Sequence, residues 1–393
     1  MASEAFDPFA NDDDDDYGDD HGDHYNDDYA DDDDDDDIFL RLDQSHPPLP
    51  TTTDDSLLRH STKTSSSTNT AIASSSSSSQ PYYLNHVRGS TRIRHASQRL
   101  AAAVGTLFAS YLLCSYSSSS LLTLSDIGLH VSSFQQVLID FGCGFGVGSC
   151  IVLLMFACEW RMGWIRIVGF WENVVKEEVF WINFGWDVLF HLGVSFNEEV
   201  MLRGWMFTLG CHGLLTFEQF RSYHPSTAAN IAITSSILLQ STLFAFLHIS
   251  SPGSSAISLL NLFLGGIAAS LNVMVAPGGS LWLGMGWHFG WNISMGHVLG
   301  RSTSGIPMSC KVVSVIPRPI AVSSSSLPSS LDEKEKKRIS YEKYHGGTFG
   351  PEQGVLAPLA YLLGMVMVVW LYGWEHFVEW RERLVMVDVT QSN

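Results

Sequence analysis

Seven stretches of this 393-residue chain approach the ~20 apolar residues that a helix needs to cross a bilayer. Inside lipid, backbone N–H and C=O groups must be hydrogen-bonded within the protein, which favours helices for stretches of this kind. The stretches lie at about residues 99–117, 136–158, 179–197, 227–248, 256–276, 281–299 and 355–373. The pattern predicts an all-α fold, a polytopic membrane helical bundle with about seven to eight transmembrane helices.

The basic residues suggest how this bundle is oriented. Four arginines precede the first stretch, and the loop 300–354 carries eight Lys and Arg. The positive-inside rule therefore predicts a cytosolic N-terminus. Arg381 and Arg383 do not agree with an odd number of spans. One further short or re-entrant segment at the interface, at 163–175, is the hypothesis that would reconcile them.

The N-terminus has a composition unlike the rest of the chain. Residues 1–43 hold 20 of the 41 Asp and Glu but one of the 22 Lys and Arg, so the remainder carries 21 of each sign. A Ser/Thr-rich linker follows at 44–85. Self-repulsion and the lack of apolar residues predict that residues 1–85 are disordered and dispensable for catalysis. We expect a helical membrane domain at 86–380 and a C-terminal tail at 381–393.

The stretch FNEEVMLRGW places two acids and an arginine in apolar surroundings. On a helix, Glu199 and Arg203 are four residues apart and share a face, whereas Glu198 points ~100° away. One carboxylate is then neutralised by the arginine, and Glu198 is left to act as a general base. The alternative is that the two acids mark the interfacial end of a span. His191, two turns before Glu198, is expected to line the same cavity.

Two further stretches place polar residues at membrane depth. In LLQSTLFAFLHIS, His248 closes an apolar run four residues after Phe244, and in GMGWHFGWNIS, His288 and Asn292 share one helical face. Taken singly, these are also typical of an interfacial histidine and of an interhelical hydrogen bond. Together with Glu198 they supply a base, two histidines for a metal or for protons, and an amide for an oxyanion.

The remaining histidines and the cysteines give no comparable signal. His212, His224 and His297 lack partners at useful spacing and are expected in loops or at the surface. The six cysteines form no C-x-x-C motif, and four of them lie in apolar runs before residue 160. Neither a disulfide framework nor a cysteine zinc site is predicted.

In order along the chain, the three motifs resemble those of the CPBP family of intramembrane proteins. This family includes the type II CAAX prenyl endopeptidases and the lysostaphin-resistance-protein-A-like proteins. The matching residues are Glu198-Glu199-x-x-x-Arg203, Phe244-x-x-x-His248 and His288-x-x-x-Asn292. The resemblance covers about residues 136–375, and the loop HGGTFGPEQG at 345–354 is similar to a glycine-rich segment of some members.

The resemblance implies an active site in a membrane cavity that opens toward the cytosol. Glu198 would activate water, beside Glu199 and Arg203, and Asn292 would hold the oxyanion. His248 and His288 would bind a metal, Zn²⁺ being the candidate, or would position the water without a metal. Both alternatives stay open, because a glutamate that ligates zinc could not easily also serve as the base.

The expected function is that of a CAAX-type intramembrane endopeptidase, with a metalloprotease as the favoured kind. Its partners would be the lipid bilayer and a membrane-associated protein substrate, prenylated or otherwise, with no nucleic acid. The expected location is multi-pass in an endomembrane, the endoplasmic reticulum being favoured. A non-enzymatic membrane scaffold or chaperone of the same fold is the alternative. A transporter is disfavoured because no inverted repeat is visible.

Overall fold

The computed structural model describes residues 89–116, 123–173, 179–308, 310–318, 339–340 and 343–391. All of them belong to one compact unit, Asp54–Asn393. The acidic and Ser-rich tail at 1–85, for which the sequence predicts disorder, lies outside the described residues.

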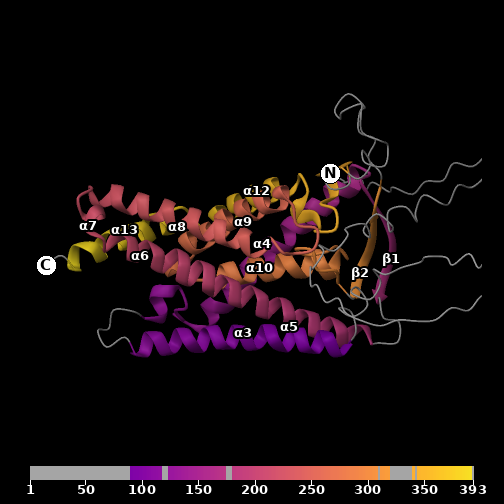
Figure 1. The fold of residues 1–393 in the computed structure, drawn as a ribbon, viewed down its shortest axis with the longest axis horizontal. Helices are drawn as coiled ribbons and strands as arrows, with labels where there is room; N and C mark the ends of the chain where they lie inside the picture. Colours follow the sequence, from indigo (N-terminus) through magenta and orange to yellow (C-terminus); the bar gives the residue numbers. More distant parts are fainter. Residues whose placement is uncertain are drawn as a thin grey trace, which may run out of the picture. The chain divides into compact units, whose positions relative to one another are not determined.

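Helices make up most of the described chain, and Figure 1 shows the longer ones lying alongside one another. The α-helices are α3 (Gly89–Tyr116), α4 (Phe134–Arg161), α5 (Phe180–Glu198), α6 (Gly210–Leu215), α7 (Glu218–Arg221), α8 (Pro225–Leu247), α9 (Ala256–Val275), α10 (Trp282–Ile293), α12 (Ala357–Tyr372) and α13 (Glu375–Gln391). Two π-helices, Glu199–Leu209 and Ser294–Val298, continue α5 and α10. Short 3₁₀ turns are Leu124–Ile127, Pro277–Gly279 and Pro351–Gln353, and the strands are β1 (Ile165–Asn173) and β2 (Cys310–Pro317).

Each of the seven apolar stretches contains a helix, but their number as membrane spans is not confirmed. Among the described residues, α4, α8 and α9 are long and apolar enough to cross a membrane. A fourth span is possible by the same measure if α12 and α13, which meet at a bend of 86°, count as one broken span. Helix α10 has only 12 residues, which is about 18 Å of helix against ~30 Å of hydrocarbon.

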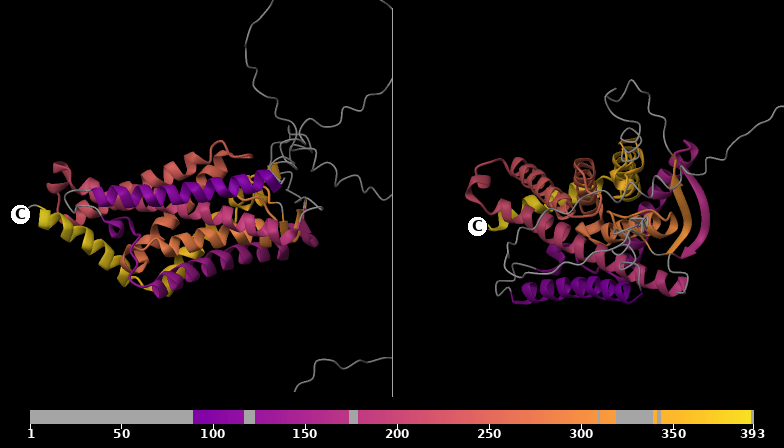
Figure 2. Two further views of the ribbon diagram at one scale, coloured as in Figure 1. Left: turned by 90° about the horizontal axis from the view of Figure 1, so that it is seen from below. Right: turned by 45° about the vertical axis from the view of Figure 1, so that its right-hand side comes forward.

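The short or re-entrant segment expected at 163–175 is an extended strand over most of its described part, not a re-entrant one. Most of it forms strand β1, which pairs antiparallel with β2, so that Ile165 lies opposite Pro317 and Asn173 opposite Cys310. Figure 2 shows the two strands side by side at one end of the helices. The sequences IRIVGFWEN and CKVVSVIP are rich in β-branched and aromatic residues, which favour strands. Their partners are distant in sequence, so the pairing could not be read from either segment alone, and the fold is not purely α.

Helices α4 and α10 touch through glycines, as the four-residue spacing predicts. A side chain at any of four positions would lie 2.0–2.4 Å from a backbone oxygen of the opposite helix: Gly144, Gly148, Gly286 and Gly290. The neighbouring pair Gly142 and Gly146 has no atom within 4 Å of such a side chain. The lack of side chains at the first four glycines therefore allows the backbones of α4 and α10 to pack in direct contact.

Polar bonds fix the helices on either side of this pair. Helix α3 runs beside α5 in Figure 1, and the Thr106 hydroxyl of α3 donates to the Asn197 side chain of α5 over 2.6 Å. Between α8 and α9, the buried Gln240 amide donates to the Ser270 hydroxyl at 2.7 Å and to the Gly266 carbonyl at 2.9 Å. Hydrogen bonds of this kind lock helix register where lipid offers no alternative partner.

Candidate active site

The first motif lies at a change of helix type. Glu198 is the last residue of α5, and Glu199 begins the π-helix Glu199–Leu209. A π-helix is wider than an α-helix, and such segments are frequent at functional sites. The π-helix Ser294–Val298 begins in the same way, two residues after Asn292. The helices that carry Glu198 and Asn292 thus continue as π-helices within two residues of these side chains.

Glu199 and Arg203 form a buried ion pair. The Arg203 Nη1 atom lies 3.3 Å from Glu199 Oε1, and both side chains are almost completely shielded from solvent. The guanidinium also lies over the Phe244 ring, 4.7 Å from its centroid, which is within the range of a cation–π interaction. The pairing agrees with the four-residue spacing, and a charge at this depth is stable only because it has this partner.

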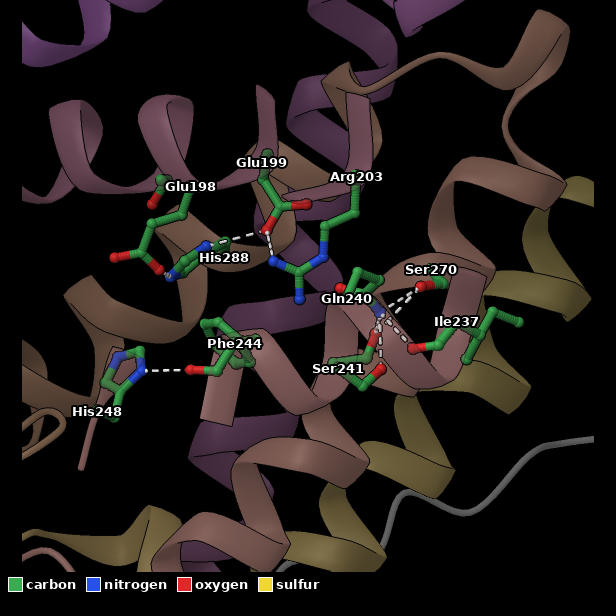
Figure 3. A network of polar contacts seen from close by, with 12 residues as sticks. Glu198, Glu199, Arg203, Ile237, Gln240, Ser241, Phe244, His248, Ser270 and His288 are labelled. Carbon is green, nitrogen blue, oxygen red and sulfur yellow. Dashed lines mark hydrogen bonds and ion pairs between the residues drawn. The ribbon is translucent and has the colours of Figure 1, made fainter. Parts of the chain in front are cut away.

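His288 lies between the two glutamates, which the spacing alone does not predict. Its Nδ1 atom is 3.1 Å from Glu199 Oε1 and its Nε2 atom is 3.8 Å from Glu198 Oε2. Figure 3 shows the imidazole between the two carboxylates, with Arg203 on the far side of Glu199. Glu199 is therefore more than a counterion for Arg203, because it also orients the imidazole that faces Glu198.

His248 caps the C-terminal end of α8 and is held there by the chain itself. Its Nδ1 atom lies 2.9 Å from the Phe244 carbonyl oxygen, and its ring meets the edge of the Phe244 ring. Since a carbonyl can only accept, Nδ1 carries a proton, and in the neutral imidazole Nε2 is the acceptor. In Figure 3, His248 stands apart from the two glutamates, beside Phe244.

The three motifs meet in one pocket of about 370 Å³. Glu198 and His288 are partly exposed in it, at 19% and 16% of their side-chain surfaces, and the buried Asn292 lines it one turn beyond His288. A water molecule occupies about 30 Å³ in the liquid, so the volume suffices for water and part of a larger ligand. The lining residues include Glu198, Glu199, Arg203, His248, His288 and Asn292, together with His191, as the sequence predicts for that residue.

The donor set of this pocket does not converge on a metal ion. Both ring nitrogens of His288 face carboxylates, and the Nδ1 atom of His248 is taken by a carbonyl. Within the described chain, Glu198, His248 and His288 are not among the groups of three whose ligand atoms lie within 4.8 Å of one another. Zinc needs at least three protein ligands in a catalytic site. The geometry of this pocket does not fit zinc.

Glu352 is a further acidic residue of the pocket, which the sequence motifs do not include. This carboxylate comes from the glycine-rich loop, is 4% exposed and lines the same pocket. Its Oε1 atom accepts from the Trp291 indole at 3.0 Å, and its Oε2 atom accepts from the Ser304 backbone N–H and hydroxyl at 2.7 Å. The resemblance of the loop 345–354 to a glycine-rich family segment pointed to this region, but it did not indicate Glu352 in particular.

Asn272, on α9, was missed as well. It is 1% exposed and lines the pocket, and its Oδ1 atom has no hydrogen-bond partner among the described residues. An unsatisfied acceptor in a pocket wall is available to a ligand N–H.

Comparison with known proteins agrees with this geometry. The sequence model of a family described as Type II CAAX prenyl endopeptidase Rce1-like matches residues 180–294. The match begins with α5 and ends two residues after Asn292, so it contains all three motifs. Residues 180–294 are therefore similar to the Rce1-like family. No curated protein and no solved structure matches the chain.

The match confirms the resemblance on which the sequence-based expectation rests. Rce1-like proteins are peptidases, and the apolar helices agree with an integral membrane protein of this family. The family match itself does not assign a role to any individual residue of the pocket.

Proposed function

We propose that this protein is an intramembrane endopeptidase of the CAAX prenyl protease type. The observation that carries the proposal is the convergence of Glu198, His288, His248 and Asn292 on one pocket with room for water. The residues come from three helices, which a single structural hydrogen bond would not require.

Glu198 is the general base in the proposed reaction. Its carboxylate is partly exposed in the pocket, whereas Glu199 is committed to Arg203 and His288. Glu198 takes a proton from water, and the hydroxide attacks the carbonyl carbon of the scissile amide. The same carboxylic acid then gives this proton to the leaving amine, so that the residue returns to its starting state.

The other side chains position the reactants. The Asn292 amide donates to the oxyanion of the tetrahedral intermediate. His248 accepts a hydrogen bond from the attacking water through Nε2, because its Nδ1 proton is given to the Phe244 carbonyl. His288, held by Glu199, fixes the Glu198 carboxylate from the other side.

The proposed substrate is a membrane-associated protein, prenylated in the case that the family description suggests. Phe244, Leu247, Trp287 and Leu262 provide apolar walls of the pocket. Such walls suit a peptide that approaches from the bilayer with an apolar tail. The proposed location is an endomembrane, with the endoplasmic reticulum favoured.

The test is cleavage of a farnesylated C-a-a-X peptide by the protein purified in detergent. Wild type should release the terminal tripeptide, and Glu198→Gln should lower the rate by at least about 10³-fold because the base is lost. Glu218→Gln, at an exposed position of α7, is the matched control and should retain full activity.

A Glu198→Gln variant that cleaves as fast as wild type would exclude the proposed base. A folded wild type that cleaves no prenylated peptide, while Glu198→Gln still supports the cellular role, would favour the scaffold or chaperone instead.

A further inference from the structure

A second group of ionisable side chains lies outside the proposed catalytic set, where α5, the π-helix Ser294–Val298 and β2 meet. It consists of Asp187, His297 and Cys310, all buried. The sequence analysis placed His297 in a loop or at the surface, which was wrong, because its side chain is 0% exposed. Its ring packs against those of Phe184 and His191.

The three ligand atoms have the spacing of a tetrahedral site. Cys310 Sγ lies 3.5 Å from Asp187 Oδ2 and 3.5 Å from His297 Nδ1, and the last two atoms are 3.9 Å apart. For zinc bonds of about 2.3 Å to sulfur and 2.0–2.1 Å to nitrogen and oxygen, tetrahedral ligand atoms are about 3.3–3.6 Å apart. The two distances to Cys310 Sγ agree with this geometry. The distance between Asp187 Oδ2 and His297 Nδ1 must shorten by less than 1 Å.

The charges also suit a divalent ion. With Cys310 as thiolate and Asp187 as carboxylate, two negative charges face the ion, while His297 is neutral. The two charges would balance a 2+ ion, so the site as a whole would be neutral in a low-dielectric interior. A mixed oxygen, nitrogen and sulfur set favours zinc over magnesium or calcium, which prefer oxygen alone.

His191 lies beside the set. It lies one turn after Asp187 on α5, is 2% exposed, and its ring centroid is 5.4 Å from that of His297. Its Nε2 atom lies 3.3 Å from the Met308 sulfur, and its Nδ1 atom has no hydrogen-bond partner among the described residues. The ring of His191 is not in the group whose ligand atoms lie within 4.8 Å of one another, so it must turn toward the ion to serve as the fourth ligand.

We propose that Asp187, His297 and Cys310, with His191 as the fourth ligand, form a structural site for a zinc-like divalent ion. In the structure, the Nδ1 atom of His297 lies 2.9 Å from the Cys310 carbonyl oxygen and donates to it. An ion replaces this contact: the imidazole proton moves to Nε2, the Cys310 thiol releases its proton to solvent, and the ring turns from the carbonyl. Binding therefore strengthens as pH rises.

The site would brace the proposed active site without taking part in its chemistry. Asp187 and His191 lie on the helix that ends at Glu198, and His297 lies five residues after Asn292. Cys310 joins both helices to the two-stranded ribbon of β1 and β2. A pair of strands is marginal by itself, and an ion would fasten it to the bundle.

The test is cobalt substitution in the full chain purified in detergent. Co²⁺ bound to a thiolate shows an intense near-ultraviolet charge-transfer band, and none of the described residues that line the proposed catalytic pocket is a cysteine. Wild type should bind close to one ion per chain and show this band. Cys310→Ser and Asp187→Asn should weaken binding by more than about 100-fold, and Cys310→Ser should lose the band.

Two variants serve as controls. Cys211→Ser alters another fully buried cysteine outside the group, and His248→Ala alters the catalytic pocket. Both should keep the ion and the band. The proposal is overturned if wild type shows no thiolate band on cobalt loading, or if His248→Ala removes the ion and Cys310→Ser does not. The wild-type spectrum decides even where Cys310→Ser fails to fold, and peptide cleavage, measured separately, reports on the proposed function.

Discussion

Replacing Arg203 by methionine removes a buried cation while keeping a long apolar side chain against Phe244. The nearest Arg203–Glu199 atoms are 3.3 Å apart, and their attraction is about 5 kcal/mol at an effective dielectric constant of about 20. In Arg203→Met the Glu199 carboxylate stays buried with His288 as its remaining partner. Breaking a buried pair typically costs 3–5 kcal/mol, and the remaining hydrogen bond places the expected loss near ~3 kcal/mol.

The double variant Arg203→Met/Glu199→Gln should be more stable than Arg203→Met alone, because no carboxylate is then left without its cation. The assay is the free energy of unfolding in detergent, measured by titration with a denaturing detergent. Arg161→Met, at an exposed position at the end of α4, is the matched control and should change stability by no more than about 0.5 kcal/mol. The reasoning fails if Arg203→Met resembles Arg161→Met, or if the double variant loses as much as the two single variants added together.

Three further changes test other parts of the structure. Asn292→Ala should lower turnover of a farnesylated peptide by about 10²–10³-fold with little change in thermal stability. Unchanged turnover would show that the Asn292 amide does not stabilise the oxyanion. Burial and then the charge of Arg301 lower the pKa of His345 from 6.5 to about 4. The folded protein then binds fewer protons than the unfolded chain between these values, so stability should fall by up to ~3 kcal/mol as pH drops through that window, and His345→Gln should flatten the profile. Gly286→Val places a side chain against a carbonyl oxygen of α4 and should abolish the monodisperse peak in size-exclusion chromatography, whereas Gly142→Val, which meets no atom within 4 Å, should keep it.

The spacing of residues along the sequence was sufficient to predict the features that depend on one helix or on one pair of helices. The apolar stretches became helices, Glu199 paired with Arg203, and the spacing of Gly286 and Gly290 marked the contact of α10 with α4. Each of these rests on the helical repeat, which is the strongest periodic signal in a sequence.

Features that depend on distant partners were missed or misplaced. Residues 165–173 form a strand because β2 lies beside them, and β2 follows about 140 residues later. His297 is buried because Cys310 and Asp187, the latter more than 100 residues earlier, surround it. His288 lies between two carboxylates that belong to a different helix, and the spacing of residues along α10 does not indicate them.

The catalytic pocket and the group around His297 take residues from the same two helices, which affects the interpretation of an experiment with a chelator. Glu198 follows Asp187 by 11 residues on α5 or at its end, and His297 follows His288 by nine on α10 and its π-helical continuation. Removing an ion from the group around His297 would release both helices and so displace Glu198 from His288, which are already 3.8 Å apart. Activity would then fall on chelation although no metal touched the substrate.

A loss of thermal stability that parallels the loss of activity, and that Cys310→Ser reproduces without chelator, identifies this structural cause. A loss of activity at constant stability in wild type and in Cys310→Ser alike would instead place the ion in the catalytic pocket, and the metal-free reaction proposed for Glu198 would be wrong.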